Sequence, residues 1–147
     1  AFHAYPVKIG ILDLGFFGYQ DLLGTDLPAS VETRSFRQDQ DLEAGEPHGA
    51  ACAEIVHDMA PGAELFLANF DTDVEQYQAI EWFDQNGVDV ISYSVGWYNA
   101  GDDKGTGPIT YDVNRAASAG ITAWPSMPAA PVTSTLTTAP AGSSRRA

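Results

Sequence analysis

The chain has 147 residues, 44% of them hydrophobic, which is enough for one domain with a substantial core. Its formal net charge of -13, with only 7 lysines and arginines, argues against nucleic acid and anionic membranes as partners, because phosphate groups are bound by positive charge. The single cysteine excludes an internal disulfide framework, and no apolar run is long enough to cross a bilayer.

The chain begins at Ala1 without a methionine or a leader segment, so we expect it to be a piece of a longer protein. Its first structured segment is an apolar run at residues 7–14, which predicts a strand buried on both faces. The run ends in Asp13, followed by Leu14 and Gly15. A carboxylate at the carboxyl end of a buried parallel strand lies where open α/β sheets place functional groups. The alternative is an aspartate that only caps the next turn.

The next segment is mostly polar. Residues 19–27 are predicted to form a short helix that Pro28 ends, and residues 30–36 a second strand. Residues 37–47 are predicted to form a surface loop with four carboxylates: Asp39, Asp41, Glu43 and Glu46. These could gather a structural calcium ion, but their spacing matches no pattern of oxygen ligands, so a solvated loop is the better interpretation.

A helix is predicted to begin at His48 and to be stopped by Pro61 and Gly62. Its apolar residues recur at the offsets of one face and predict an inward-packing stripe: Cys52, Ile55, Val56 and Met59. A histidine in the first turn, followed by Gly49 and small residues, keeps its ring accessible while the helix packs closely on a sheet. His48 is therefore a candidate general base, and Cys52 is interpreted as a small core residue.

The remaining elements alternate between strand and helix. Strands are predicted at residues 63–70 and 88–95, and a further strand begins at residue 121. A helix with capping side chains at residues 71–73 lies between the first two, and another helix spans residues 108–119. The first of these helices carries apolar residues at three-residue steps: Val74, Tyr77, Ile80 and Phe83. This order predicts an α/β fold in which helices cover both faces of a parallel sheet.

Two of these motifs together resemble the aspartate and histidine motifs of the subtilisin-like serine proteases. They are Lys8-Ile9-Gly10-Ile11-Leu12-Asp13-Leu14-Gly15, and His48-Gly49-Ala50 with Met59-Ala60-Pro61. The order, Asp before His, is also that of the family, although the family usually has threonine at the position of Ala50. The resemblance implies an endopeptidase that works through an acyl-enzyme, in which Asp13 orients the imidazole and His48 acts as general base and then acid.

A third motif, at residues 90–96, is similar to the family's strand that ends in Ser-Leu-Gly and pairs with the substrate chain. Here the strand ends in Ser94, Val95 and Gly96, which the resemblance makes the binding segment for a polypeptide substrate. Without the other motifs these residues would be only a strand end and a turn. The resemblance implies no cofactor and no catalytic metal, and it favours an extracellular or cell-surface location.

The resemblance covers about residues 5–122, and we predict residues 1–122 to be the N-terminal part of a subtilisin-like catalytic domain. Residues 123–147 are rich in Ala, Pro, Ser and Thr, contain no Asp, Glu or Asn, and are predicted to form an irregular tail. The family's oxyanion asparagine and its Gly-Thr-Ser nucleophile motif are absent from this segment, so we expect the chain alone to be inactive. A reading-frame shift after Thr122, a disordered tail and a linker to another domain each explain the change in composition.

Two other functions compete with this interpretation. The first is a non-catalytic α/β binding module, in which Asp13 is only a cap and His48 has no catalytic role. The second is a pseudoprotease that binds peptides without cleaving them. Geometry separates the binding module from the protease, because only a proton relay requires Asp13 and His48 to lie within hydrogen-bond reach. A sheet without the family's later strands would also expose an unpaired edge, for which we expect marginal stability or self-association.

Overall fold

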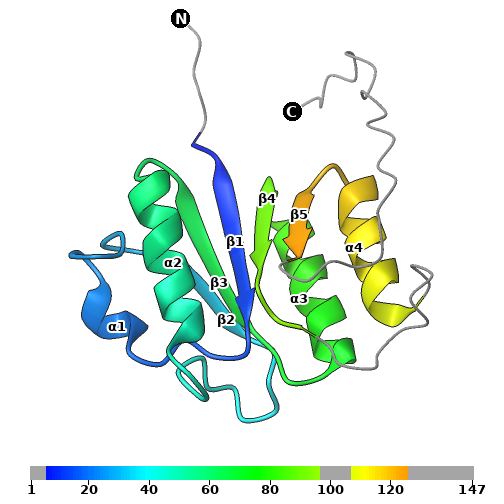
Figure 1. Cartoon of the computed structure of the whole chain (residues 1–147), viewed down its shortest axis with the longest axis horizontal. Coiled ribbons are helices and arrows are strands. Elements are labelled where there is room, and N and C mark those ends of the chain that lie inside the picture. Colours follow the sequence, from blue (N-terminus) through cyan, green and yellow to red (C-terminus); the bar gives the residue numbers. More distant parts are fainter. Residues whose placement is uncertain (1–5, 97–106, 126–147) are drawn as a thin grey trace, which may run out of the picture.

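The computed structural model describes residues 6–96 and 107–125. Its centre is a five-stranded sheet with the strand order β2-β3-β1-β4-β5 (Figure 1). The strands are β1 (Lys8–Asp13), β2 (Glu32–Ser35), β3 (Glu64–Asn69), β4 (Val90–Tyr93) and β5 (Thr122–Pro125). Every pairing between neighbouring strands is parallel. The carboxyl ends of the strands therefore meet at one edge of the sheet, which we call the C-terminal edge.

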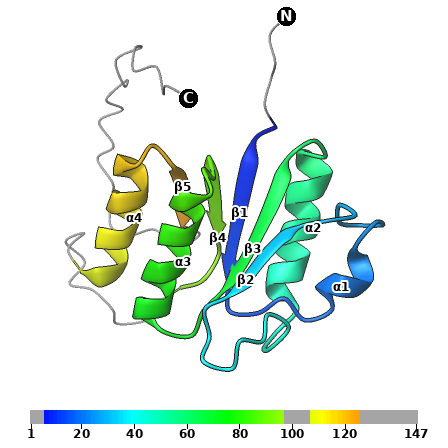
Figure 2. The same ribbon diagram turned by 180° about the vertical axis from the view of Figure 1, so that it is seen from behind.

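Helices cover both faces of the sheet, as predicted. The short α1 (Tyr19–Leu22) and α2 (His48–Met59) lie on the face turned to the viewer in Figure 1. The longer α3 (Asp73–Gln85) and α4 (Pro108–Ser118) lie on the other face, which Figure 2 shows from behind. None of the helices that the structure describes has the length and apolar character needed to cross a bilayer.

The central strand β1 explains why the sheet needs cover on both faces. Its neighbouring residues Ile11 and Leu12 are both fully buried, and successive side chains of a strand point to opposite faces. Ile11 belongs to the core beneath α2, together with Leu65 and Ala53. Leu12 belongs to the core beneath α3 and α4, together with Phe83. The predicted strand buried on both faces is therefore confirmed.

The predicted inward stripe of α2 is partly wrong. Ile55 and Met59 are 60% and 83% exposed, whereas Gly49, Ala50 and Ala53 are buried. The helix packs on the sheet through its smallest residues, because these allow the closest approach of the two backbones. Helical periodicity identified an apolar face but did not identify the face that contacts β1.

Other boundaries also differ from the prediction. The first helix ends at Leu22 instead of residue 27, because Gly24 has a positive φ of 79° and the chain turns there. β4 ends at Tyr93, so residues 94 and 95 lie outside the paired ladder. β5 spans Thr122–Pro125 and so includes the first residues of the segment 123–147, whose assignment as a tail stays a prediction. The remainder of that segment, residues 126–147, lies outside the described residues.

The start of α3 confirms the predicted capping. The Thr72 side chain accepts the N–H of Glu75 at 3.3 Å, and the Glu75 carboxylate accepts the N–H of Thr72 at 3.0 Å. This reciprocal capping box satisfies donors that the first helical turn leaves unpaired. It fixes the start of α3 directly after β3, at the C-terminal edge. Val74, the first of the apolar residues at three-residue steps, is 61% exposed.

Candidate active site

Asp13 is the last residue of β1, and its side chain is buried at the C-terminal edge of the sheet. Its partner in the ladder with β3 is Asn69. Oδ1 of Asp13 accepts the N–H of Leu14 at 2.8 Å, and the backbone carbonyl of Asp13 accepts the N–H of Phe70 at 3.3 Å. One carboxylate oxygen is thus anchored to the backbone, and the other, Oδ2, faces α2.

His48 is the first residue of α2, and its Nδ1 lies 2.7 Å from Oδ2 of Asp13. A carboxylate oxygen is an acceptor, so Nδ1 carries the proton in this hydrogen bond and Nε2 is left as the acceptor nitrogen. The His48 side chain is 51% exposed, whereas that of Asp13 is 5% exposed. The pair therefore consists of a buried orienting carboxylate and an imidazole that a reactant can approach from solvent.

Two glycines allow α2 to approach the end of β1 this closely. The N–H of Gly49 donates to the carbonyl oxygen of Gly15 at 3.1 Å. A Cβ atom at Gly49 would lie 2.5 Å from that oxygen and 2.8 Å from Cβ of Asp13. A Cβ atom at Gly15 would overlap the carbonyl oxygen of Ala44 in the loop before α2. Glycine at both positions is therefore a geometric condition for the contact between Asp13 and His48.

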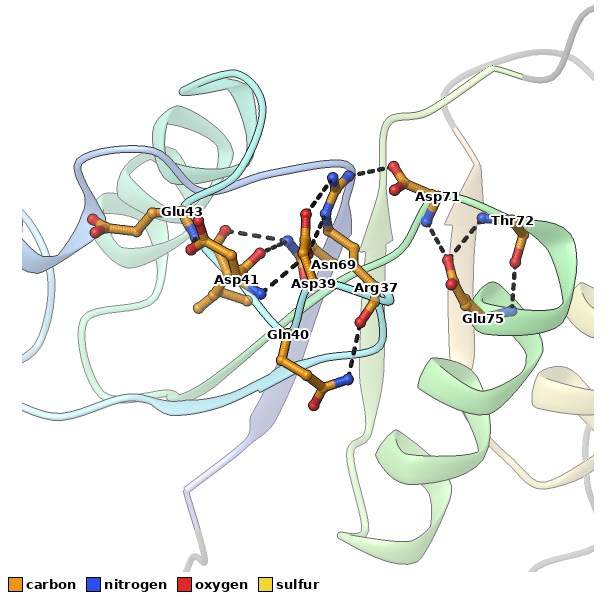
Figure 3. A network of polar contacts seen from close by, with 10 residues as sticks. Arg37, Asp39, Gln40, Asp41, Glu43, Asn69, Asp71, Thr72 and Glu75 are labelled. Carbon is orange, nitrogen blue, oxygen red and sulfur yellow. Dashed lines mark hydrogen bonds and ion pairs between the residues drawn. The ribbon is translucent and has the colours of Figure 1, made fainter.

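The acidic loop before α2 is held by its own side chains (Figure 3). Arg37 forms ion pairs with Asp39 and, on the loop after β3, with Asp71. The hydrogen bond between Arg37 and Asp39 lowers the pKa of the Asp39 carboxyl, and the same hydrogen bond raises the pKa of Arg37. Asp41 accepts the N–H of Glu43 at 2.9 Å, so these carboxylates have structural uses within the loop. Calcium binding by this loop stays a prediction.

Sequence reasoning missed Asn69, the fully buried last residue of β3. Its Nδ2 donates to the carbonyl oxygens of Asp41 at 2.8 Å (Figure 3) and Leu42 at 3.2 Å. The Leu42 carbonyl also accepts the N–H of Phe16 at 3.0 Å. Asn69 thus ties the end of β3 to the loop that supports the chain directly after Asp13. A polar residue at the end of an otherwise apolar strand was the available signal.

Cys52 lies one helical turn after His48, and its Sγ is 3.9 Å from each ring nitrogen. Burial raises the pKa of the Cys52 thiol, and the negative charge of Asp13 raises it further. The Ser94 side chain lowers this pKa, but its effect is the smallest of the three. A protonated thiol is a poor nucleophile, which agrees with the packing role expected for Cys52. It also contacts the core beneath α2.

One group of potential metal ligands in the described part of the chain coincides with this site. Asp13, His48 and Cys52 each place a ligand atom within 4.8 Å of the others. Both carboxylate oxygens of Asp13 already accept N–H groups, from Leu14 and from His48. The same atoms therefore form the hydrogen-bonded pair, and the absence of a metal from this site stays a prediction.

Ser94, Val95 and Gly96 follow β4 directly, and we call them the rail. Ser94 and Val95 are half-buried, and Gly96 is exposed. Ser94 lowers the pKa of the Cys52 thiol and so lies near it, and that thiol is 3.9 Å from each ring nitrogen of His48. The structure thus brings together three segments that are far apart in the sequence, at the ends of β1 and β4 and at the start of α2. The loop after Gly96 lies outside the described residues.

A hollow of about 380 Å³ adjoins the exposed side of His48. Its lining combines apolar side chains with two carboxylates: Phe17, Gly18, Leu22, Glu46, Pro47, His48, Ala50, Ala51 and Glu54. The imidazole therefore faces a space that can receive part of a larger molecule.

A search of protein-family models found no match, and neither did a search of curated protein sequences. Solved structures do match. A lanthipeptide protease is 25% identical with a TM-score of 0.59, over 78% of this chain and 37% of that protein. The nisin leader peptidase NisP from Lactococcus lactis is 18% identical with a TM-score of 0.55, over 83% of this chain and 43% of that protein.

The fold is that of the subtilisin-like serine proteases. The resemblance seen in the sequence motifs is thus supported by the path of the whole described sheet. The chain spans less than half the length of either similar structure. Both of these proteins are peptide-cleaving enzymes, so the chain has a protease-related fold, and the Asp13–His48 pair lies at the sheet edge where an α/β fold places functional groups.

Proposed function

We propose that this chain supplies the acid–base pair and the substrate-binding segment of a subtilisin-like serine endopeptidase. The observation that carries the proposal is the 2.7 Å hydrogen bond between Nδ1 of His48 and Oδ2 of Asp13, beneath a half-exposed imidazole. Asp13 fixes the tautomer and stabilises the imidazolium. Nε2 of His48 then takes the proton of an attacking hydroxyl and later gives it to the leaving amine.

The rail binds the substrate through its main chain. An extended polypeptide pairs with the backbone of residues 94–96 as an added strand, which gives affinity for many sequences and leaves selectivity to side-chain pockets. The effect of Ser94 on the pKa of Cys52 supports this assignment, since the Cys52 thiol lies 3.9 Å from each ring nitrogen of His48. The hollow next to His48 leaves space for the substrate on the other side of the pair.

The printed sequence contains no Gly-Thr-Ser motif, and residues 123–147 contain no asparagine. Both motifs belong to the family's nucleophile and oxyanion donor, so we expect the chain alone to bind peptides without hydrolysing them. Loss of the nucleophile of a catalytic triad costs about a million-fold in rate, so we expect no turnover. Self-association through an outer strand of the sheet and an extracellular or cell-surface location belong to the same proposal.

Titration of an extended peptide tests the rail. The chain, a Gly96→Pro variant and a Gly96→Ala control are compared by NMR chemical-shift changes. Proline removes the Gly96 N–H and should weaken binding at least about tenfold, whereas alanine keeps the donor and should bind as the parent does. Equal affinity of all three proteins would remove the rail from the proposal.

A phosphonate probe for active serines tests the predicted inactivity. The chain should remain unlabelled under conditions in which a complete subtilisin-like protease is labelled. Labelling would show that the chain supplies its own nucleophile.

A further inference from the structure

Three polar side chains form a row across the C-terminal edge of the sheet, on the face turned to α2. They are the last residues of three neighbouring strands, and the register of the ladders pairs Asp13 of β1 with Asn69 of β3, and Asn69 with Ser35 of β2. Directly paired residues of parallel strands turn their side chains to the same face. Asn69 is therefore the cross-strand neighbour of the carboxylate that orients His48.

The side-chain amide of Asn69 is a buried double donor. Asn69 is 0% exposed, and its Nδ2 donates to the carbonyl oxygen of Asp41 at 2.8 Å (Figure 3) and to that of Leu42 at 3.2 Å. A primary amide has two N–H donors, whereas a threonine hydroxyl has one, and leucine and an ionised aspartate have none. Both amide hydrogens are thus used to hold the loop before α2.

That loop in turn holds the segment that follows β1. The Leu42 carbonyl, which accepts from Asn69, also accepts the N–H of Phe16 at 3.0 Å. The carbonyl of the preceding residue, Gly15, accepts the N–H of Gly49 at 3.1 Å, in the first turn of α2. Hydrogen bonds therefore connect the end of β3 to the start of α2 through the residues that directly follow the catalytic carboxylate.

A second connection between the same two loops lies at the surface. Arg37 forms an ion pair with Asp71, whose side chain is 50% exposed (Figure 3). Ion pairs in contact with solvent contribute little to stability, because water screens the attraction and ordering the side chains costs entropy. Asn69, which is fully buried, is thus the firmer anchor of the loop.

Asn69 is also an unfavourable residue for the core in which it lies. Its Oδ1 is buried and has no hydrogen-bond partner within the described residues, and the same holds for Oγ of Ser35. A buried acceptor without a partner carries a desolvation penalty. Residues 65–68 of the same strand are apolar and buried, so an apolar side chain would suit this position better by packing alone. Departures from such packing rules are expected at functional sites.

We propose that Asn69 is a positioning residue for the acid–base pair. By holding the loop before α2 through both amide hydrogens, it keeps Oδ2 of Asp13 aligned with Nδ1 of His48 at 2.7 Å. Without this anchor the imidazole is held less firmly, and more of it carries the proton on Nε2, where it cannot accept a proton from an attacking hydroxyl. This inference rests on the proposed function and adds a residue that acts through the backbone.

The ¹⁵N chemical shifts of the His48 ring at neutral pH test this inference, because they report the tautomer without any need for turnover. Asn69→Leu keeps nearly the shape of the side chain and removes both donors, and Asn69→Thr keeps one donor. Two controls lie close by in the sequence. Asp71→Asn removes only the surface ion pair, and Thr72→Ala weakens the start of α3. Urea unfolding measures the stability of every variant.

In Asn69→Leu, the ratio of the Nδ1-protonated to the Nε2-protonated ring should fall at least about threefold, with Asn69→Thr between this variant and the parent. Both controls should keep the parent ratio, Thr72→Ala despite its lower stability. An unchanged ratio in Asn69→Leu overturns the positioning role, and so does an equal fall in Thr72→Ala.

Two further outcomes are decided by the same samples. If Asn69→Leu does not fold, Asn69→Thr is measured alone and should still show a lower ratio than the parent. If neither variant folds even with sucrose as a stabilising osmolyte, Asn69 serves folding and the positioning role is overturned. A parent ring protonated mainly at Nε2 overturns the proposed function as well, whereas a parent ring protonated at Nδ1 with no response to either Asn69 variant overturns only this inference.

Discussion

Replacement of Gly49 by alanine tests the packing that brings His48 to Asp13. The added Cβ would lie 2.5 Å from the Gly15 carbonyl oxygen, 2.8 Å from Cβ of Asp13 and 2.9 Å from the ring of Phe16. The first of these is a backbone atom, so no change of side-chain rotamer relieves the clash. Overpacking of this kind costs about 1–3 kcal/mol, while alanine in place of glycine within a helix returns about 1 kcal/mol. Because Gly49 lies in the first turn of α2 and not in its interior, only part of that gain applies, and we expect Gly49→Ala to lose about 1–2 kcal/mol of unfolding free energy.

Urea unfolding followed by far-UV circular dichroism measures this loss. Gly62→Ala is the matched control, because a Cβ at Gly62 has nothing within 4 Å and should change stability by less than about 0.5 kcal/mol. If Gly49→Ala unfolds at the same urea concentration as the parent, α2 is not packed against the end of β1 as described.

Three further predictions concern caps and titrating groups. Thr72→Ala removes one half of the capping box and should cost about 1 kcal/mol in urea unfolding; an unchanged midpoint would contradict the cap. Because burial raises the pKa of the Asp112 carboxyl on α4, the folded chain binds the carboxyl proton more tightly than the unfolded chain, and stability should fall as pH rises from about 4. Asp112→Asn should lessen that fall, and identical pH profiles would refute the assignment. The raised pKa of Cys52 predicts slower alkylation by iodoacetamide at about pH 8 in the native chain than in the urea-unfolded chain, and equal rates would oppose it.

The sheet was predictable because its central strand leaves a clear pattern. A continuous apolar run such as β1 is stable only with cover on both faces, and both Ile11 and Leu12 are buried as that argument requires. The contact between Asp13 and His48 was predictable from motifs, since a carboxylate at a strand end and a histidine at a helix start meet at the same edge. Its distance depends on Gly15 and Gly49, whose role is visible only in three dimensions.

The packed face of α2 could not be predicted from hydrophobicity. Ile55 and Met59 fit helical periodicity, but the helix approaches the sheet through Gly49 and Ala53, where backbones can come closest. Asn69 was missed for a related reason, because its partner Asp41 lies 28 residues earlier in the chain, beyond the reach of any local pattern.

The central claim is that Asp13 holds His48 through Nδ1 and leaves Nε2 to accept a proton. The ¹⁵N chemical shifts of the His48 ring at neutral pH measure this directly, in the parent chain and in an Asp13→Ala variant. We predict that the neutral form of the ring carries its proton on Nδ1 in the parent, and that the variant loses this preference. A parent ring protonated mainly at Nε2, or ring shifts unaffected by Asp13→Ala, would contradict the proton relay.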